Sequence, residues 1–170
     1  MTELAPVDVP AAHEIWNEYA AAHPRATAGE GPPSVERFGD NPALCEQLLG
    51  LVLDGTKTAT SSLVAEYEHE GAPLPRIGSH WIACDSRGRP RAILRSTELR
   101  LGTIDSVDAD FASDEGEDDR SRDSWLVEHE KFWRRSCAAI GIAWERELPI
   151  VFERFDVVWT APADEHPETD

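Results

Sequence analysis

The spacing of apolar residues along the chain predicts three helices. The first places Ile15, Trp16 and Tyr19 at helical spacing and gives way to a run rich in glycine and proline. The second has proline in its first turn, repeats leucine and valine near every fourth residue, and stops at a glycine. The third gathers its large apolar residues on one side. The predicted helices span Ala11–His23, Asn41–Gly55 and a segment from Ser121 or Asp123 to about Gly141.

Shorter segments rich in β-branched and aromatic residues predict four strands. In the last of them apolar residues alternate with polar ones, and Glu153 interrupts the apolar face. A carboxylate on the core side of a strand is either paired with an arginine or part of a site, and we favour the pairing first. Between the third and fourth strands, the acidic stretch Asp105–Asp119 predicts a solvated loop with helical turns. The predicted strands are Thr60–Tyr67, His80–Asp85, Arg91–Leu101 and Ile150–Trp159.

Length and composition limit the class of protein. A chain of 170 residues with 41% hydrophobic and 29% charged residues is long enough for one globular domain with its own core. No apolar run approaches the roughly 18 residues that span a bilayer, and the first residues lack the pattern of a signal peptide. We therefore expect a soluble, cytoplasmic protein with no membrane partner.

The cysteines and histidines provide no metal-binding pattern. Cys45, Cys84 and Cys137 are widely separated and show no CxxC spacing, so we expect small buried side chains rather than a disulfide framework or a zinc ribbon. His129 lies among aromatic residues of the third helix, where a packing residue is the favoured interpretation. No cofactor is evident, no metal ligands are predicted, and a requirement for a divalent metal is left open.

The formal charge of -17 argues against a protein that grips nucleic acid over its whole surface. The segment Arg76–Arg100 differs from the rest, because it carries six arginines against Asp85 and Glu98. Such a basic stripe on an acidic body favours a small or transient nucleotide contact over tight duplex binding. The alternative is that these arginines are strand residues that face water.

The segment Gly55–Thr60 is the strongest candidate for chemistry. It places Lys57, one of only two lysines in the chain, among three threonines between a helix and a strand. A lysine ammonium can activate a neighbouring hydroxyl or hold an oxyanion, whereas a solvated loop lysine is the plainer alternative. The segment is not a Walker loop, because Thr56 separates Gly55 from Lys57 and a helix precedes it. HExxH, GxSxG and GxGxxG motifs are absent from the sequence.

The order of these features resembles the ASCH family, in its longer bacterial form, over about Phe38 to Trp159. The features that carry the likeness are Gly55-Thr56-Lys57-Thr58-Ala59-Thr60, Glu66-Tyr67, Pro75-Arg76-Ile77-Gly78-Ser79, Phe111-Ala112-Ser113-Asp114-Glu115-Gly116-Glu117, Trp125 with His129 and Phe132-Trp133, and Val151-Phe152-Glu153-Arg154-Phe155. The resemblance implies an α+β fold, a PUA-like β-barrel flanked by helices and preceded by an N-terminal accessory helix. The implied division is a helix and linker in residues 1–33, the ASCH domain in 34–162 and a flexible tail in 163–170.

The resemblance also implies a site and a choice of functions. By motif, the functional positions of the small family amidohydrolases fall on Lys57, Thr60 and Glu115, with Asp114, Glu117 and Asp118 as alternatives to the glutamate. Lys57 would fold back toward the Thr60 hydroxyl and activate it or a water, while Glu115 would move the proton to the leaving group. The substrate-binding candidates are Thr58, Tyr67, Arg76, Glu153 and Arg154.

Three functions remain open at this point. The first hypothesis is a ribonuclease for single-stranded RNA, in which Lys57 stabilises charge on the scissile phosphate. The second is hydrolysis of the amide of N4-acetylcytidine, and the third is a binding module for RNA or modified nucleotides without catalysis. The partner is therefore single-stranded RNA or a nucleoside. Trp16 on the leading helix either covers the barrel or forms a homodimer contact.

Overall fold

The computed structural model describes residues 3–162. In chain order its elements are α1 (Val9–Ala22), β1 (Ser34–Glu36), α2 (Pro42–Leu53), β2 (Ala59–Leu63), α3 (Val64–Glu70), β3 (His80–Cys84), β4 (Pro90–Gly102), the 3-10 turn η1 (Ile104–Ser106), α4 (Ala109–Glu115), α5 (Arg122–Ala139) and β5 (Ile150–Thr160). Among the described residues, no helix is both long and apolar enough to cross a membrane.

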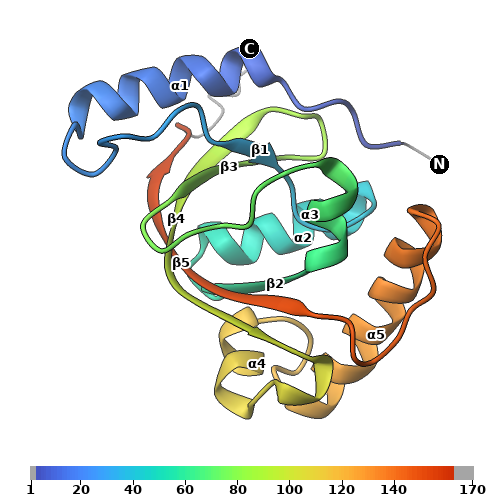
Figure 1. Ribbon diagram of the computed structural model, residues 1–170. Coiled ribbons are helices and arrows are strands. Elements are labelled where there is room, and N and C mark those ends of the chain that lie inside the picture. Colours follow the sequence, from blue (N-terminus) through green and yellow to red (C-terminus); the bar gives the residue numbers. More distant parts are fainter. Residues whose placement is uncertain (1–2, 163–170) are drawn as a thin grey trace, which may run out of the picture.

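The strands form one curled sheet in the order β1-β3-β4-β5-β2. Strand β1 runs parallel to β3, and the other neighbours are antiparallel. The long strands β4 and β5 pair over most of their length, with register shifts at Ile93/Leu94 and between Ser96 and Glu98. Such bulges increase the local twist and bend a strand. The sheet therefore curls into a half-barrel, as Figure 1 shows along β4 and β5.

Three groups of helices cover different parts of this sheet. Helix α1 packs its Trp16 against Ile82 and Ile93 of β3 and β4. Helix α2 packs against other residues of the same strands and against Phe155 of β5. Helices α4 and α5 pack against Leu63 of β2 and against Ile150 and Phe152 of β5, at the opposite end of the molecule from α1 (Figure 1). Each apolar stripe of a helix is thus buried against the sheet, which supplies most of a helix's stability.

The three predicted helices are confirmed, and their first turns explain where they begin. Asn41 accepts a hydrogen bond from the Leu44 N–H at the start of α2, with Pro42 at the first helical position. Ser121 does the same for the Ser124 N–H at the start of α5. These side chains satisfy backbone donors that have no partner inside the helix. Of the two N-caps considered from sequence, Ser121 is therefore the one used.

The predicted strand Thr60–Tyr67 is wrong in its second half. Strand β2 ends at Leu63, and α3 begins at Val64, so Tyr67 lies on a helix. The Glu66 carboxylate accepts a hydrogen bond from the Leu63 N–H, and Gly71 ends the helix in a left-handed conformation with φ 66°. This local capping outweighs the strand preference of the aromatic and β-branched residues. The other three predicted strands are confirmed as β3, β4 and β5.

The helical turns predicted in the acidic stretch Asp105–Asp119 are confirmed as η1 and the helix α4, but the stretch is not solvated throughout, because α4 buries Phe111 and Glu115. Asp108 caps α4 by accepting from the Phe111 N–H, and Phe111 is buried in the core. The many Asp and Glu residues of this stretch indicated exposure to solvent, although its few apolar residues are spaced so that they face the core. Glu115 at the end of α4 is consequently buried rather than solvated.

The leading helix covers the sheet, which settles the local role of Trp16. Its ring lies 5.2 Å from that of His80, centroid to centroid, and is buried. The short strand β1 was not predicted, because three residues after a glycine- and proline-rich run carry no readable alternation. The three cysteines are free and buried, as expected. The predicted tail 163–170 lies outside the described residues.

Candidate active site

A pocket of about 1080 Å³ opens where β2, α3, α5 and the linker of residues 29–33 meet. Lys57, Thr60 and Glu115, the three residues that the resemblance implied as catalytic, all line it. Two of them are in direct contact, because Lys57 Nζ lies 3.1 Å from Glu115 Oε2. The pocket therefore gathers the predicted residues, although Lys57 comes from the segment before β2, Thr60 from β2 and Glu115 from α4.

The predicted substrate-binding residues divide into two groups. Tyr67 and Arg76 line the pocket. Thr58 and Arg154 are not among its described lining residues; both contact Asp114 of α4 instead. These two side chains hold α4 against β2 and β5, outside the pocket. The fifth candidate, Glu153, has a separate environment described below.

Lys57 is almost completely inaccessible, with 1% of its side chain exposed. Its ammonium donates to Glu117 Oε1 at 2.8 Å, to Glu115 Oε2 at 3.1 Å and to the Glu115 carbonyl oxygen at 3.4 Å. Burial by itself would lower the pKa of Lys57, but the two carboxylates outweigh it and raise the pKa. The ammonium is therefore charged. The prediction that Lys57 folds back toward the Thr60 hydroxyl is wrong, because its hydrogen bonds go to the glutamates.

Glu115 accepts hydrogen bonds on both carboxylate oxygens. Ser61 Oγ donates to Oε1 at 2.6 Å, while Lys57 Nζ and His129 Nε2 each lie 3.1 Å from Oε2. Burial raises the pKa of Glu115, but Lys57 and His129 outweigh it and hold the pKa far below its usual range. Glu115 is consequently an ionised carboxylate whose acceptor positions are largely occupied.

The backbone holds the two halves of this cluster together. The Thr58 N–H donates to the Asp114 carbonyl oxygen at 2.8 Å, which joins the start of β2 to the end of α4. Gly116 ends α4 with φ 71°, and a Cβ there would lie 2.7 Å from the Thr56 carbonyl oxygen. Only glycine permits this close approach without strain. The contact explains how Lys57 reaches Glu115, which is 58 residues away in the sequence.

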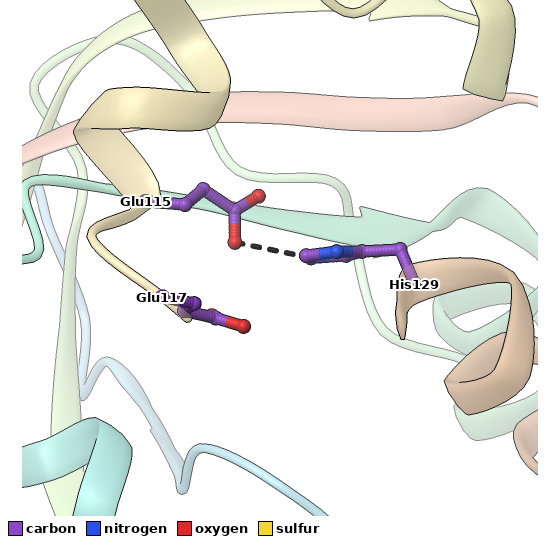
Figure 2. Close-up of side chains that lie close together, drawn as sticks. All are labelled: Glu115, Glu117 and His129. Carbon is purple, nitrogen blue, oxygen red and sulfur yellow. Dashed lines mark hydrogen bonds and ion pairs between the residues drawn. The ribbon is translucent and has the colours of Figure 1, made fainter. Parts of the chain in front are cut away.

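His129 is the functional-site residue that the sequence interpretation missed. It extends from α5 toward Glu115, as Figure 2 shows, and its ring stacks on Trp125 at 4.0 Å. Both of its partners are acceptors: Nε2 faces the Glu115 carboxylate, and Nδ1 lies 2.9 Å from the Trp125 carbonyl oxygen. A neutral imidazole has one N–H and cannot donate to both. Burial would lower the pKa of His129, but Glu115 raises it, in agreement with an imidazolium.

Glu117 differs from Glu115 although it lies only two residues away. It follows α4 in the loop, as Figure 2 shows. Its side chain is 20% exposed. Its hydrogen bond comes from Lys57, and burial together with the nearby Glu115 charge raises its pKa. Of the two glutamates in this cluster, Glu117 is therefore the one that binds a proton more readily.

Glu115, Glu117 and His129 together have the donor types of a divalent metal site. Their ligand atoms in Glu115, Glu117 and His129 all lie within 4.8 Å of one another. Carboxylate and imidazole groups suit several divalent metals. The Lys57 ammonium, however, already bonds to both carboxylates, and a metal ion at this position would face its positive charge. We therefore describe the cluster as an internal ion network centred on Lys57.

Glu153 occupies the other end of the pocket and has no cationic partner among the described residues. It lies on β5 directly across from Thr60 of β2. Its Oε1 accepts hydrogen bonds from Ser96 Oγ at 2.6 Å and from Trp81 Nε1 at 3.2 Å. The sequence interpretation that an arginine would pair with Glu153 is wrong: neighbouring Arg154 faces Asp114 and Glu98 instead.

The pocket as a whole is acidic. Ten of its charged lining residues are Asp or Glu, whereas four are Lys or Arg. The four are Arg37, Lys57, Arg76 and Arg135, and the last pairs with Asp40. Of the six arginines in the predicted basic stripe, only Arg76 is among the described lining residues. The stripe is therefore not the charge that a ligand in this pocket would meet.

The fold and the pocket define a class of protein: a mixed α+β half-barrel, flanked by helices, of the PUA-like type. The family model of the ASCH domain matches residues 34–159, and the chain belongs to the ASCH domain family. This family is generally associated with RNA. The fold expected from the resemblance is thus confirmed.

Two solved structures are similar to this chain over most of their length. One is a protein from Enterococcus faecalis V583, with a TM-score of 0.78 and 28% identity, covering 88% of this chain and 89% of that chain. The other is an ASCH domain from Lactobacillus crispatus JV V101, with a TM-score of 0.76 and 27% identity, covering 88% and 94%. The search of curated proteins found no match.

Proposed function

We propose that this protein hydrolyses the amide of an N4-acylated cytidine and takes the free nucleoside as substrate. The observation that carries the proposal is a buried, charged lysine held by two glutamates beside an acidic pocket of about 1080 Å³. Ligand pockets for small molecules commonly measure roughly 300–1,000 Å³, so a nucleoside has ample room. Lysine, threonine and glutamate are also the residue types that the family resemblance associates with this amide hydrolysis.

The charge of the pocket favours a nucleoside over an RNA strand. Each nucleotide of a strand brings a negative phosphate, which the excess of carboxyl groups over lysines and arginines in the lining would repel. Lys57 cannot offset this repulsion, because its charge is already balanced by Glu115 and Glu117. A ribonuclease, the first hypothesis from sequence, would need phosphate-neutralising groups that this pocket has in small number. An uncharged nucleoside avoids the repulsion.

Lys57 and Glu115 would form the fixed electrostatic part of the site. Amide hydrolysis develops negative charge on the acyl oxygen, and an ammonium fixed beside that oxygen stabilises the charge. The longest of the Lys57 hydrogen bonds, to the Glu115 carbonyl oxygen at 3.4 Å, is the one that the acyl oxygen would replace. Glu115, with Ser61 and His129 on its oxygens, keeps the ammonium charged and in place.

Glu117 would carry the proton in this reaction. A water attacks the acyl carbon and gives its proton to Glu117, while the negative charge collects on the acyl oxygen next to Lys57. The bond between the acyl carbon and N4 then breaks, and Glu117 returns the proton to N4, so that cytidine and acetic acid leave; the acid then gives its remaining proton to solvent and becomes acetate. The raised pKa and partial exposure of Glu117 suit this exchange better than the occupied oxygens of Glu115. Thr60, whose side chain lines the pocket, would orient the water.

The test compares four proteins on two substrates: the wild type, Lys57→Met, Glu117→Gln and Lys131→Met. Lys131 is the other lysine of the chain and forms an exposed pair with Glu128, so its variant is the matched control. Released cytidine is quantified from N4-acetylcytidine, and fragments are quantified from fluorescent single-stranded RNA. We expect kcat/KM for cytidine release to fall about 10²–10³-fold in Lys57→Met and about 10²–10⁴-fold in Glu117→Gln.

The remaining outcomes separate the other functions. RNA fragments without cytidine release, lost in Lys57→Met, would replace the proposal with a ribonuclease. Inactivity on both substrates, with saturable RNA binding that Thr60→Ala leaves unchanged, would indicate a binding module. Thermal melting of each variant shows whether a loss of activity is a loss of fold.

A further inference from the structure

The proposed hydrolysis leaves Glu153, a second buried carboxyl group of the pocket, without a role. Only 4% of Glu153 is exposed, and it is nevertheless one of the residues that line the pocket. A buried carboxylate ordinarily has a cationic partner, because burying an unpaired charge is costly. The side chains that act on Glu153 among the described residues are Ser96 and Trp81, and neither is a cation. This absence suggests that the group is held in its neutral form.

The hydrogen bonds of Glu153 determine which oxygen would carry the proton. Ser96 and Trp81 both bond to Oε1, and the indole N–H of Trp81 can only donate. Oε1 is therefore fixed as an acceptor, and in a protonated carboxyl group the hydrogen lies on Oε2. Because neither of these bonds uses Oε2, that oxygen is available to a ligand in the pocket.

Flat aromatic side chains lie next to this carboxyl group. Trp81 bonds to Glu153 through its ring nitrogen, and the Phe38 ring lies 5.2 Å from that of Trp81. Lys57 Nζ lies 5.7 Å from the centre of the Phe38 ring. Aromatic faces of this kind bind the faces of nucleic-acid bases. A base against these rings would thus lie between Glu153 and the Lys57 cluster.

We propose that Glu153, protonated on Oε2, donates a hydrogen bond to the ring nitrogen N3 of the cytosine base and is the residue that selects cytosine over uracil. The inference rests on the proposed function, since it names the base-reading residue of the same pocket. Cytosine N3 is an acceptor, whereas uracil carries a hydrogen on N3 and would present a donor to a donor. One hydrogen bond made or lost in this way corresponds to about tenfold in affinity.

The surroundings of Glu153 support the neutral form. Burial raises the pKa of Glu153, and the hydrogen bonds from Ser96 and Trp81 do not cancel this effect. The titratable group that faces it is the Tyr67 hydroxyl of α3, whose pKa burial raises to about 12, so that it is uncharged near neutral pH. From β2, β3 and β4 it meets Thr60, Trp81 and Ser96, which carry no charge.

The test measures binding of cytidine and uridine by calorimetry, without any turnover, between about pH 6 and pH 9. For the wild type we expect about tenfold tighter binding of cytidine than of uridine at the acidic end, with the preference falling as Glu153 loses its proton. Glu153→Gln presents an amide N–H in place of the carboxyl O–H, so it should keep the cytidine preference at every pH. Glu153→Leu should lose the preference. Asp156→Asn, at an exposed carboxylate of the same strand, is the matched control.

Two results would overturn the assignment: equal binding of the two nucleosides by the wild type, including no binding of either, or a cytidine preference that Glu153→Leu retains. Glu153→Gln tests the idea even where Glu153→Leu fails to fold, because loss of the preference in a folded Glu153→Gln protein contradicts it. Cytidine-selective binding that depends on Glu153, with no hydrolysis of N4-acetylcytidine, would support the base-reading role while refuting the amidohydrolase. Hydrolysis of N4-acetylcytidine, with a cytidine preference that Glu153→Leu leaves unchanged, would support the amidohydrolase and refute the base-reading role of Glu153.

Discussion

Glu115 and Glu153 are both nearly inaccessible carboxyl groups on one pocket, yet their environments act on them in opposite directions. Glu115 receives hydrogen bonds from Lys57, His129 and Ser61, and its pKa is lowered. Glu153 receives bonds from neutral donors, and its pKa is raised. Burial disfavours the charged form of each. The presence or absence of cations then decides which one ionises.

This difference assigns separate tasks to two ends of the pocket. An ionised glutamate with a charged lysine provides a fixed field beside a reacting group, whereas a neutral carboxyl group provides a hydrogen-bond donor. Carboxyl groups whose pKa values are pushed apart by their surroundings commonly have different roles in one site. The comparison therefore predicts that equivalent substitutions at the two ends have unequal effects.

Removal of the cation at the charged end should have the largest effect on stability. Lys57→Met leaves the buried Glu115 carboxylate and the partly exposed Glu117 without their ammonium, and breaking a buried ion pair such as that of Lys57 with Glu115 costs about 3–5 kcal/mol. Lys131→Met removes an exposed pair and should cost less than about 1 kcal/mol. Urea unfolding of the two variants measures the difference. Similar losses in both would show that the Lys57 network does not stabilise the fold.

The backbone contact that assembles the charged end should have the next largest effect. Gly116→Ala places a Cβ 2.7 Å from the Thr56 carbonyl oxygen at φ 71°, whereas Gly71→Ala has φ 66° and open space. Both should lose about 1–2 kcal/mol from the left-handed conformation. Gly116→Ala should lose about 1–3 kcal/mol more, because the overpacked neighbours must move. Equal free energies of unfolding for the two variants would contradict this role of Gly116.

The smallest effect is a pair of opposite pH dependences. The lowered pKa of Glu115 contributes stability above its unfolded value near 4.5, and this is lost as the pH falls toward the folded value. The raised pKa of Glu153 acts in reverse, since stability decreases as the pH rises from 4.5 through the folded value.

The corresponding measurement is the free energy of unfolding of the wild type, Glu115→Gln and Glu153→Gln between about pH 3 and pH 8. The free energy of unfolding of the wild type relative to that of Glu115→Gln should increase with pH. Relative to that of Glu153→Gln it should decrease with pH. Each difference should amount to about 1 kcal/mol or more per unit of pKa shift. Parallel curves for the two variants would show that the two carboxyl groups ionise alike.

The elements that were predicted well are those specified by neighbouring residues. Asn41 with Pro42 starts α2, and Ser121 starts α5, through contacts three residues away. Their content of β-branched and aromatic residues located the long strands β4 and β5, although each strand buries several successive residues rather than every second one. The turn into α3 was missed because the capping contact of Glu66 was not weighed against the strand preference around it.

The candidate site was predicted in part. Lys57 is unusual in a chain whose cations are otherwise nearly all arginines, and this rarity is visible without any structure. His129 was interpreted as a packing residue because its partner, Glu115, lies 14 residues away in a stretch that resembles a solvated acidic loop. A buried histidine among aromatic residues, opposite a glutamate that ends an apolar turn, was the available signal.

The sequence by itself determined the helices α1, α2 and α5, the strands β3, β4 and β5, the family resemblance and the rare lysine, because each depends on local spacing or on residue type. Only the tertiary structure decided which carboxyl groups are ionised. Glu115 meets Lys57 across 58 residues, and Glu153 meets Trp81 across 72. The charge of a buried group depends on the burial and on the partners that folding brings to it, and neither is written in the neighbouring residues.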